Sequence, residues 1–141
     1  MEKTNKLRVF LAYGLFIIVL ANMPGQYLPG ILTFSPSLNH VMAFFVMGLL
    51  LHRAVRTGYA EIGAMLLGVG YLIEWMQLLG GYREFSFIDL FFDIIGITLY
   101  IVVTHYYQNR SIFKAKEYAD FSSNPLADAL GLETNKVPVH Y

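Results

Sequence analysis

Four apolar segments alternate with short polar segments along this chain. They run from Leu7 to about Met23, from about Leu38 to Val55, from about Ile62 to Leu79 and from about Phe87 to Tyr107. Each approaches the ~20 residues that a helix of about 1.5 Å rise per residue needs to cross a ~30 Å hydrocarbon layer. The second segment is the weakest, because only Val41 to Leu51 lacks strongly polar side chains. The pattern predicts an all-α polytopic membrane protein, with four transmembrane helices in an antiparallel bundle.

Composition favours a membrane protein over a soluble helical bundle. Hydrophobic residues make up 56% of the 141 positions and charged residues only 14%, whereas a soluble domain carries about 25% charged residues. The helices of a soluble bundle would also show charged faces, and these segments do not. The formal net charge is zero, so no nucleic-acid partner is predicted. The chain has no cysteine, which excludes disulfides and thiol chemistry.

Basic residues predict the orientation in the membrane. Nine of the ten lie near the start of the first segment, at the end of the second or just after it, or after the fourth: Lys3, Lys6, Arg8, Arg53, Arg56, Arg110, Lys114, Lys116 and Lys136. The other side of the predicted membrane has only Arg83. Because positive charge favours the cytoplasmic side, we expect both termini in the cytoplasm and the chain in the bacterial inner membrane.

The ends of the chain complete the predicted organisation. The first segment follows basic residues, as a signal peptide does, but it lacks an Ala-x-Ala cleavage site and is interpreted as an uncleaved span. Residues 1–107 then form the transmembrane domain, and residues 108–141 form a polar, mostly flexible cytoplasmic tail. Within the tail, Asn124 and Pro125 followed by Gly131 predict a short helix over 125–130.

A few polar side chains interrupt the apolar segments, although an ionised group at a helix centre costs about 3 kcal/mol in insertion measurements. Helical spacing places them on three shared faces: His40, Phe44, Met47 and Leu51; Gly63, Leu67, Gly70, Glu74 and Gln77; and Asp89, Asp93, Gly96 and Tyr100. Glycine lets helices approach closely, so such faces are expected to point into the bundle. In the predicted topology the polar groups meet near the outer leaflet, and the cytoplasmic half has no matching set.

The spacing of these residues resembles the VanZ-like family. The resemblance covers about residues 36–103 and consists of Glu74-x-x-Gln77, Arg83, Asp89, a polar residue at position 93 and Gly96, with His40, Ala43 and Phe44 opening the second span. Two positions depart from the family pattern. Pro36 and Ser37 stand where the family has aspartate and lysine, and Asp93 stands where it has asparagine. The resemblance implies a bacterial cell-envelope context, and the family's namesake contributes to resistance to the glycopeptide teicoplanin.

Three functions are compatible with this set of residues. In the first, His40, Glu74, Gln77, Arg83, Asp89 and Asp93 bind a polar headgroup at the outer leaflet, from a membrane lipid, a lipid-linked cell-wall or polysaccharide intermediate or an antibiotic. Arg83 suits phosphate or carboxylate, because its planar guanidinium donates two hydrogen bonds at once. In the second, the histidine and carboxylates perform acid-base chemistry or hold a divalent metal. No HExxH-like spacing or nucleophile-base pair supports that, so no catalytic residue, metal or cofactor is predicted.

In the third, the polar groups are structural. Glu74 and Gln77 would hydrogen-bond Asp93 or His40 across helices, and the chain would be an accessory subunit of an envelope or exopolysaccharide biosynthesis complex. Amide substitutions separate these readings, because Glu74→Gln and Asp93→Asn keep hydrogen bonds but remove charge. A structural role predicts that both are tolerated, whereas binding or catalysis predicts that at least one fails.

Overall fold

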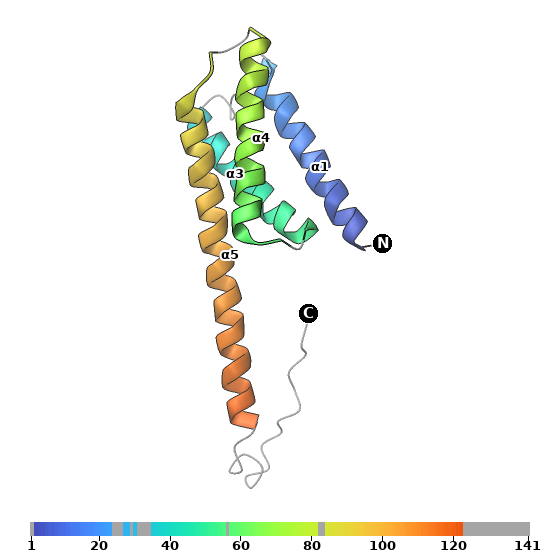
Figure 1. Cartoon of the computed structure of the whole chain (residues 1–141), viewed down its shortest axis with the longest axis vertical. Coiled ribbons are helices and arrows are strands. Elements are labelled where there is room, and N and C mark those ends of the chain that lie inside the picture. Colours follow the sequence, from blue (N-terminus) through green and yellow to red (C-terminus); the bar gives the residue numbers. More distant parts are fainter. Residues whose placement is uncertain are drawn as a thin grey trace. The chain divides into compact units, whose positions relative to one another are not determined.

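The chain is all-helical in the part that the structure describes. A computed structural model describes residues 2–23, 27–28, 30, 35–55, 57–81 and 84–122, and no strand occurs in these ranges. The helices are α1 (Glu2–Ala21), α3 (Pro36–Ala54), α4 (Tyr59–Leu79) and α5 (Phe87–Ser122) (Figure 1). Each of them covers all or most of one of the four predicted segments, which confirms the all-α class.

Three of these helices have the length and composition of membrane spans: Thr4–Ala21 in α1, all of α4, and Phe87–Glu117 in α5. The chain is therefore a membrane protein by the character of its helices. The remaining helix, α3, is less apolar, because Asn39 and His40 lie near its start and His52 and Arg53 near its end. This is the physical reason why the second segment is the weakest of the four.

Local signals define where the helices begin and end. Ser35 precedes α3 and its hydroxyl accepts a hydrogen bond from the Leu38 backbone N–H at 3.4 Å, while Pro36 occupies the first helical position. After α4, Gly81 adopts a left-handed backbone with φ of 67°, a conformation that favours glycine. The predicted end of the third segment at Leu79 is thus confirmed.

The chain divides into two compact units, residues 1–104 and 105–141. The first holds the core, in which residues of α3, α4 and the first part of α5 are buried together: Phe44, Met47, Leu51, Ile62, Leu66, Ile73, Ile97 and Tyr100. Partly buried residues of α1 pack against this cluster, and α1 packs mainly against α3. Figure 1 shows α3 crossing behind α4 in this unit.

Several polar side chains are buried beside this apolar core, while many large apolar side chains are exposed. Glu74, Gln77 and Asp93 are at most 1% exposed. Large apolar side chains such as Leu72 and Phe87 are instead 61% and 79% exposed. Outward apolar and inward polar side chains are expected where hydrocarbon surrounds the helices. The predicted inward faces are confirmed at all positions except His40, which is only partly buried, and Leu67, which is 40% exposed.

The fourth helix is longer than predicted. The predicted span ends near Tyr107, whereas α5 continues to Ser122, within the segment expected to be a flexible tail. In this second unit, side-chain hydrogen bonds follow the helix: Asn109 bonds His105 at 3.0 Å, and the Ser111 hydroxyl donates to the Gln108 carbonyl at 2.7 Å. The short helix expected over 125–130 lies outside the described residues.

Candidate functional site

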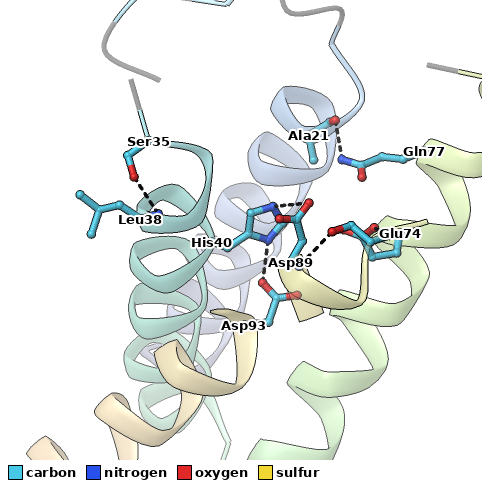
Figure 2. Close-up of polar contacts among 9 residues, drawn as sticks. Ala21, Ser35, Leu38, His40, Glu74, Gln77, Asp89 and Asp93 are labelled. Carbon is cyan, nitrogen blue, oxygen red and sulfur yellow. Dashed lines mark hydrogen bonds and ion pairs between the residues drawn. The ribbon is translucent and has the colours of Figure 1, made fainter. Parts of the chain in front are cut away.

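Helix ends bring the predicted polar residues together. His40 lies in the second turn of α3, Asp89 and Asp93 lie in the first two turns of α5, and Glu74 and Gln77 lie in the last two turns of α4. Ala21, the last residue of α1, borders the same group. We call His40, Glu74, Gln77, Asp89 and Asp93 the polar cluster. Figure 2 shows His40, Glu74, Asp89 and Asp93 gathered together from three helices, while Gln77 points toward Ala21.

His40 connects two carboxylates of α5. Its Nδ1 atom lies 2.8 Å from Oδ1 of Asp93, and its Nε2 atom lies 3.8 Å from Oδ2 of Asp89. Asp89 and Asp93 are four residues apart and therefore lie on one face of the helix, one turn from each other. The imidazole thus faces a carboxylate on each of its nitrogens, one at hydrogen-bond distance and one farther away.

Glu74 completes the N-terminal cap of α5. The Ser86 hydroxyl accepts from the Asp89 backbone N–H at 3.1 Å, and the Ser86 backbone N–H donates to Glu74 Oε2 at 2.8 Å. In a capping box, the side chain of the third helical residue would take that second hydrogen bond. Here the third residue is Asp89, and a carboxylate from the neighbouring helix takes its place. The Asp89 side chain consequently faces His40 instead of its own helix end.

Gln77 connects α4 to the end of α1. Its Nε2 donates to the backbone carbonyl of Ala21 at 2.8 Å, which is one of the carbonyls that a helix C-terminus leaves without a partner. Its Oε1 is buried and has no hydrogen-bond partner among the described residues, and the same holds for Oε1 of Glu74. Buried polar atoms of this kind are uncommon and point to a missing partner.

Two glycines allow the helices to approach closely at the polar cluster. A Cβ atom on Gly70 would lie 2.6 Å from Oδ2 of Asp93, so α4 can accept this carboxylate only where it lacks a side chain. A Cβ atom on Gly96 would collide with the Val41 backbone carbonyl of α3. The contact between α3 and α5 at Gly96 brings His40 within reach of Asp93. Small residues have the same effect at many helix contacts in membranes.

Three residues of the polar cluster have the spacing of metal ligands. One nitrogen of His40 and one oxygen each of Glu74 and Asp89 lie within 4.8 Å of one another. Imidazole nitrogen and carboxylate oxygen are ligands for Zn²⁺ and other divalent ions.

An apolar cavity of about 590 Å³ borders the polar cluster. Most of its lining comes from α1 and α3, including Phe16, Ile17, Leu20 and Ala43, and its polar lining includes His40 and Gln77. Ligand pockets have volumes of about 300–1,000 Å³ and combine mostly apolar walls with a few polar groups. The cavity therefore has the size and lining of a site for an amphiphilic molecule.

The predicted contacts were correct in part. His40, Glu74, Gln77, Asp89 and Asp93 lie together, but Arg83 falls outside the described residues. The expected hydrogen bonds of Glu74 and Gln77 to Asp93 or His40 were wrong, because these side chains bond Ser86 and Ala21. Both side chains hydrogen-bond backbone groups at helix ends instead. A sequence pattern shows side chains and does not reveal such backbone partners.

A second polar contact, at the other end of α3, was not predicted. His52 Nδ1 lies 2.9 Å from the hydroxyl of Tyr100, which is fully buried, and the His52 ring stacks on Tyr59 with centroids 5.3 Å apart. The expectation that this half of the bundle has no matching polar set therefore needs correction. The sequence did indicate an inward-facing Tyr100, because its helical spacing places it on the same face as Asp93 and Gly96.

Comparison with known protein families, curated proteins and solved structures finds no match to this chain. The resemblance to the VanZ-like family rests on the residues quoted for it.

Proposed function

We propose that this chain is a VanZ-like membrane protein of the bacterial cell envelope that binds an amphiphile by its polar headgroup. The headgroup would belong to a lipid-linked intermediate or a glycopeptide-type antibiotic. The supporting observation is the apolar cavity of about 590 Å³, whose lining includes His40 and Gln77 of the polar cluster. Apolar walls beside a few buried polar groups suit a molecule with a hydrocarbon part and a polar end.

The proposal includes four membrane crossings in an antiparallel bundle, with α3 as the second. Its 19 residues extend about 28 Å, close to the ~30 Å hydrocarbon layer. His40 at one end and Arg53 at the other would then lie near the two boundaries. With both termini in the cytoplasm of a bacterial inner membrane, the polar cluster would lie at the outer leaflet. The distribution of basic residues supports this orientation.

Single cysteines test the orientation, because the natural chain has none. Glu84 and Thr57 are exposed and lie on opposite sides of α4 along the chain. We expect Glu84→Cys to react with a membrane-impermeant maleimide in intact spheroplasts, and Thr57→Cys to react only after permeabilisation. The reverse pattern would place the polar cluster on the cytoplasmic side and reject an outer-leaflet site.

Recognition of the headgroup is assigned to the polar cluster together with Arg83. The role of Arg83 rests on its position in the sequence between α4 and α5 and on the capacity of guanidinium to hold phosphate through two hydrogen bonds. Gln77 has a buried Oε1 without a partner among the described residues and can accept from a hydroxyl group. Phosphate and hydroxyl groups are the chemistry of lipid-linked sugars, which supports this class of ligand.

Binding is tested with purified protein in detergent, using a polyprenyl phosphate, the matching polyprenol without phosphate, and teicoplanin. We expect the phosphate lipid to bind more tightly than the alcohol, and Arg83→Ala to remove that difference.

Two phenylalanine variants test whether the cavity is the site. Ala43→Phe fills the cavity wall and should weaken binding, whereas Ala64→Phe, on an exposed part of α4, is the matched control. Equal binding by the Ala43 and Ala64 variants would reject the cavity as the site. Saturation by teicoplanin alone would identify the antibiotic as the ligand.

A structural role is the second candidate, and interhelical contacts favour it. The His40–Asp93 and Gln77–Ala21 hydrogen bonds join α3 to α5 and α4 to α1. The chain would then be an accessory subunit of an envelope or exopolysaccharide biosynthesis complex without a binding site of its own. Under this alternative, none of the three probes binds saturably, and Glu74→Gln and Asp93→Asn leave the folded protein and its co-purifying partners unchanged.

A further inference from the structure

We infer that His40, Glu74 and Asp89 form a binding site for a divalent transition-metal ion, with Asp93 as the residue that orients His40. The site goes beyond the proposed function, and it does not require that an amphiphile binds in the cavity. Sequence patterns do not predict it, because the three ligands come from three different helices and have no diagnostic spacing.

The ligand atoms are already close to the distances that a metal requires. One atom from each of the three residues lies within 4.8 Å of the other two, and His40 Nε2 lies 3.8 Å from Asp89 Oδ2. Ligand bonds to Zn²⁺ of about 2.0–2.2 Å place two ligand atoms of a tetrahedral site about 3.4 Å apart. The ligand atoms would therefore move closer together when the ion binds.

Asp93 gives the imidazole the orientation that metal-binding histidines have. Ligating histidines almost always donate their second ring N–H to a carboxylate or carbonyl, which sets the tautomer. Oδ1 of Asp93 lies 2.8 Å from Nδ1 of His40. When Nδ1 carries the proton, the lone pair of Nε2 points toward Asp89, where the metal would lie (Figure 2). Asp93 is 1% exposed and held against Gly70, so this orientation is well supported by packing.

Glu74 supplies an independent indication of a ligand. Its side chain is fully buried, Oε2 accepts from the Ser86 N–H, and Oε1 has no hydrogen-bond partner in the part of the chain that is described. A buried carboxylate oxygen without a partner is costly. A cation between Glu74, Asp89 and His40 would satisfy this oxygen.

The negative charge of the polar cluster also favours a bound cation. Glu74, Asp89 and Asp93 are all at most 5% exposed. When all three carboxylates are ionised, they carry more negative charge than one protonated imidazole can offset, and uncompensated charge is expensive in a buried site. A divalent ion on a neutral His40 supplies the missing positive charge.

The donor set limits the choice of ion. One imidazole nitrogen and two carboxylate oxygens suit Zn²⁺ or Mn²⁺, whereas Mg²⁺ prefers oxygen ligands and retains several waters. Three protein ligands leave at least one coordination position for water or for an oxygen of a bound molecule.

The test uses the full-length protein, purified in detergent through a tag without histidine. After incubation with ZnCl₂ or MnCl₂ and gel filtration, we expect about one metal ion per chain by elemental analysis, and saturable binding in a competition titration with a metal indicator. MgCl₂ is the comparison and should bind at least 10-fold more weakly. The absence of saturable binding of both Zn²⁺ and Mn²⁺ would overturn the inference.

Variants localise the ion. Glu74→Gln should lower the affinity by at least 10-fold, while Glu61→Gln, an exposed carboxylate on the same helix, should leave it unchanged. Asp93→Asn keeps the hydrogen bond to His40 and removes its charge, so we expect a loss of about 10–100-fold, as for other residues that support a ligand. Equal affinity of the Glu74 and Glu61 variants would place the ion elsewhere.

X-ray absorption of the Zn²⁺-loaded natural protein gives a readout that does not depend on how the variants fold. One imidazole nitrogen with otherwise oxygen ligands at about 2.0–2.2 Å is expected. A shell with several imidazoles, or with no imidazole, would reject His40 as the single histidine ligand. Neither measurement involves lipid, so a failure here is distinct from a failure of the amphiphile-binding proposal.

Discussion

The Nδ1 atom of His40 lies 2.8 Å from Oδ1 of Asp93, 53 residues away along the chain. The other oxygen of the same carboxylate, Oδ2, rests against Gly70 of α4. Asp93 is thus held between α3 and α4 while it belongs to α5. Because the Asp93 side chain contacts both neighbouring helices, a change in the packing of any of the three helices should alter the His40–Asp93 contact.

Gly70→Ala should weaken the His40–Asp93 contact. The new methyl group would lie 2.6 Å from Oδ2 of Asp93, and the carboxylate can turn away because it is the end of a side chain. We expect a loss of up to about 1.5–3 kcal/mol in the free energy of unfolding, which is the value of a hydrogen bond to a charged group. Unfolding in detergent measures this effect.

Gly68→Ala is the control, since a Cβ atom there meets nothing within 4 Å on the same helix. This variant should be as stable as the natural protein, or up to about 1 kcal/mol more stable, because alanine favours helix over glycine. The prediction is contradicted if the two alanine variants have the same stability.

Gly96→Ala should be more damaging than Gly70→Ala. Its methyl group would collide with the Val41 backbone carbonyl and approach Cβ of Phe44 at 3.1 Å. A backbone carbonyl within a helix cannot turn aside, so α3 and α5 must separate, and overpacking of this kind costs about 1–3 kcal/mol or more. Gly14→Ala, where no atom lies within 4 Å, is the matched variant in α1. A melting temperature for Gly96→Ala equal to that of Gly14→Ala would show that the helices are not in close contact.

Gln77→Leu should loosen the C-terminal end of α1. The substitution removes the hydrogen bond to the Ala21 carbonyl and leaves that partly buried group without this partner. We expect a loss of about 0.6 kcal/mol, the average measured for interhelical hydrogen bonds in a membrane protein, and at most about 1.7 kcal/mol. Hydrogen exchange of the Asn22 and Met23 amides should become faster, whereas the exposed neighbour variant Met76→Leu should not change it. Unchanged exchange would argue that α4 does not hold this end of α1.

Tyr100→Phe should destabilise the opposite end of the bundle without affecting the polar cluster. It removes the hydroxyl that lies 2.9 Å from His52 and keeps the ring packed on Gly48. The expected loss is about 1 kcal/mol, the net value of a typical hydrogen bond. Tyr71→Phe, which changes a half-exposed tyrosine of α4, is the control for thermal unfolding. If both variants melt at the same temperature, the His52–Tyr100 contact does not contribute to stability.

The sequence by itself determined the all-α class and most of the inward-facing positions. Runs of apolar residues of membrane-crossing length leave no other class, and a period of 3.6 residues assigns Glu74, Gln77 and Asp93 to buried faces. The end of α4 was predicted at Leu79, where two glycines follow, whereas α3 starts at Pro36, before the predicted start at about Leu38. The end of α5 was not predicted, because a helix continues past the apolar segment into polar sequence without any terminating residue near Tyr107.

Only the tertiary structure decided which polar side chains meet which partners. Glu74 accepts from the backbone of Ser86, and Gln77 donates to the backbone of Ala21, and neither backbone group is visible in a pattern of side chains. The proximity of His40, Glu74 and Asp89 depends on the approach of three helices, which Gly70 and Gly96 permit but do not specify. Helical periodicity sets the face on which a residue lies. The partner it meets across that face depends on the depth and rotation of the neighbouring helix, which packing alone determines.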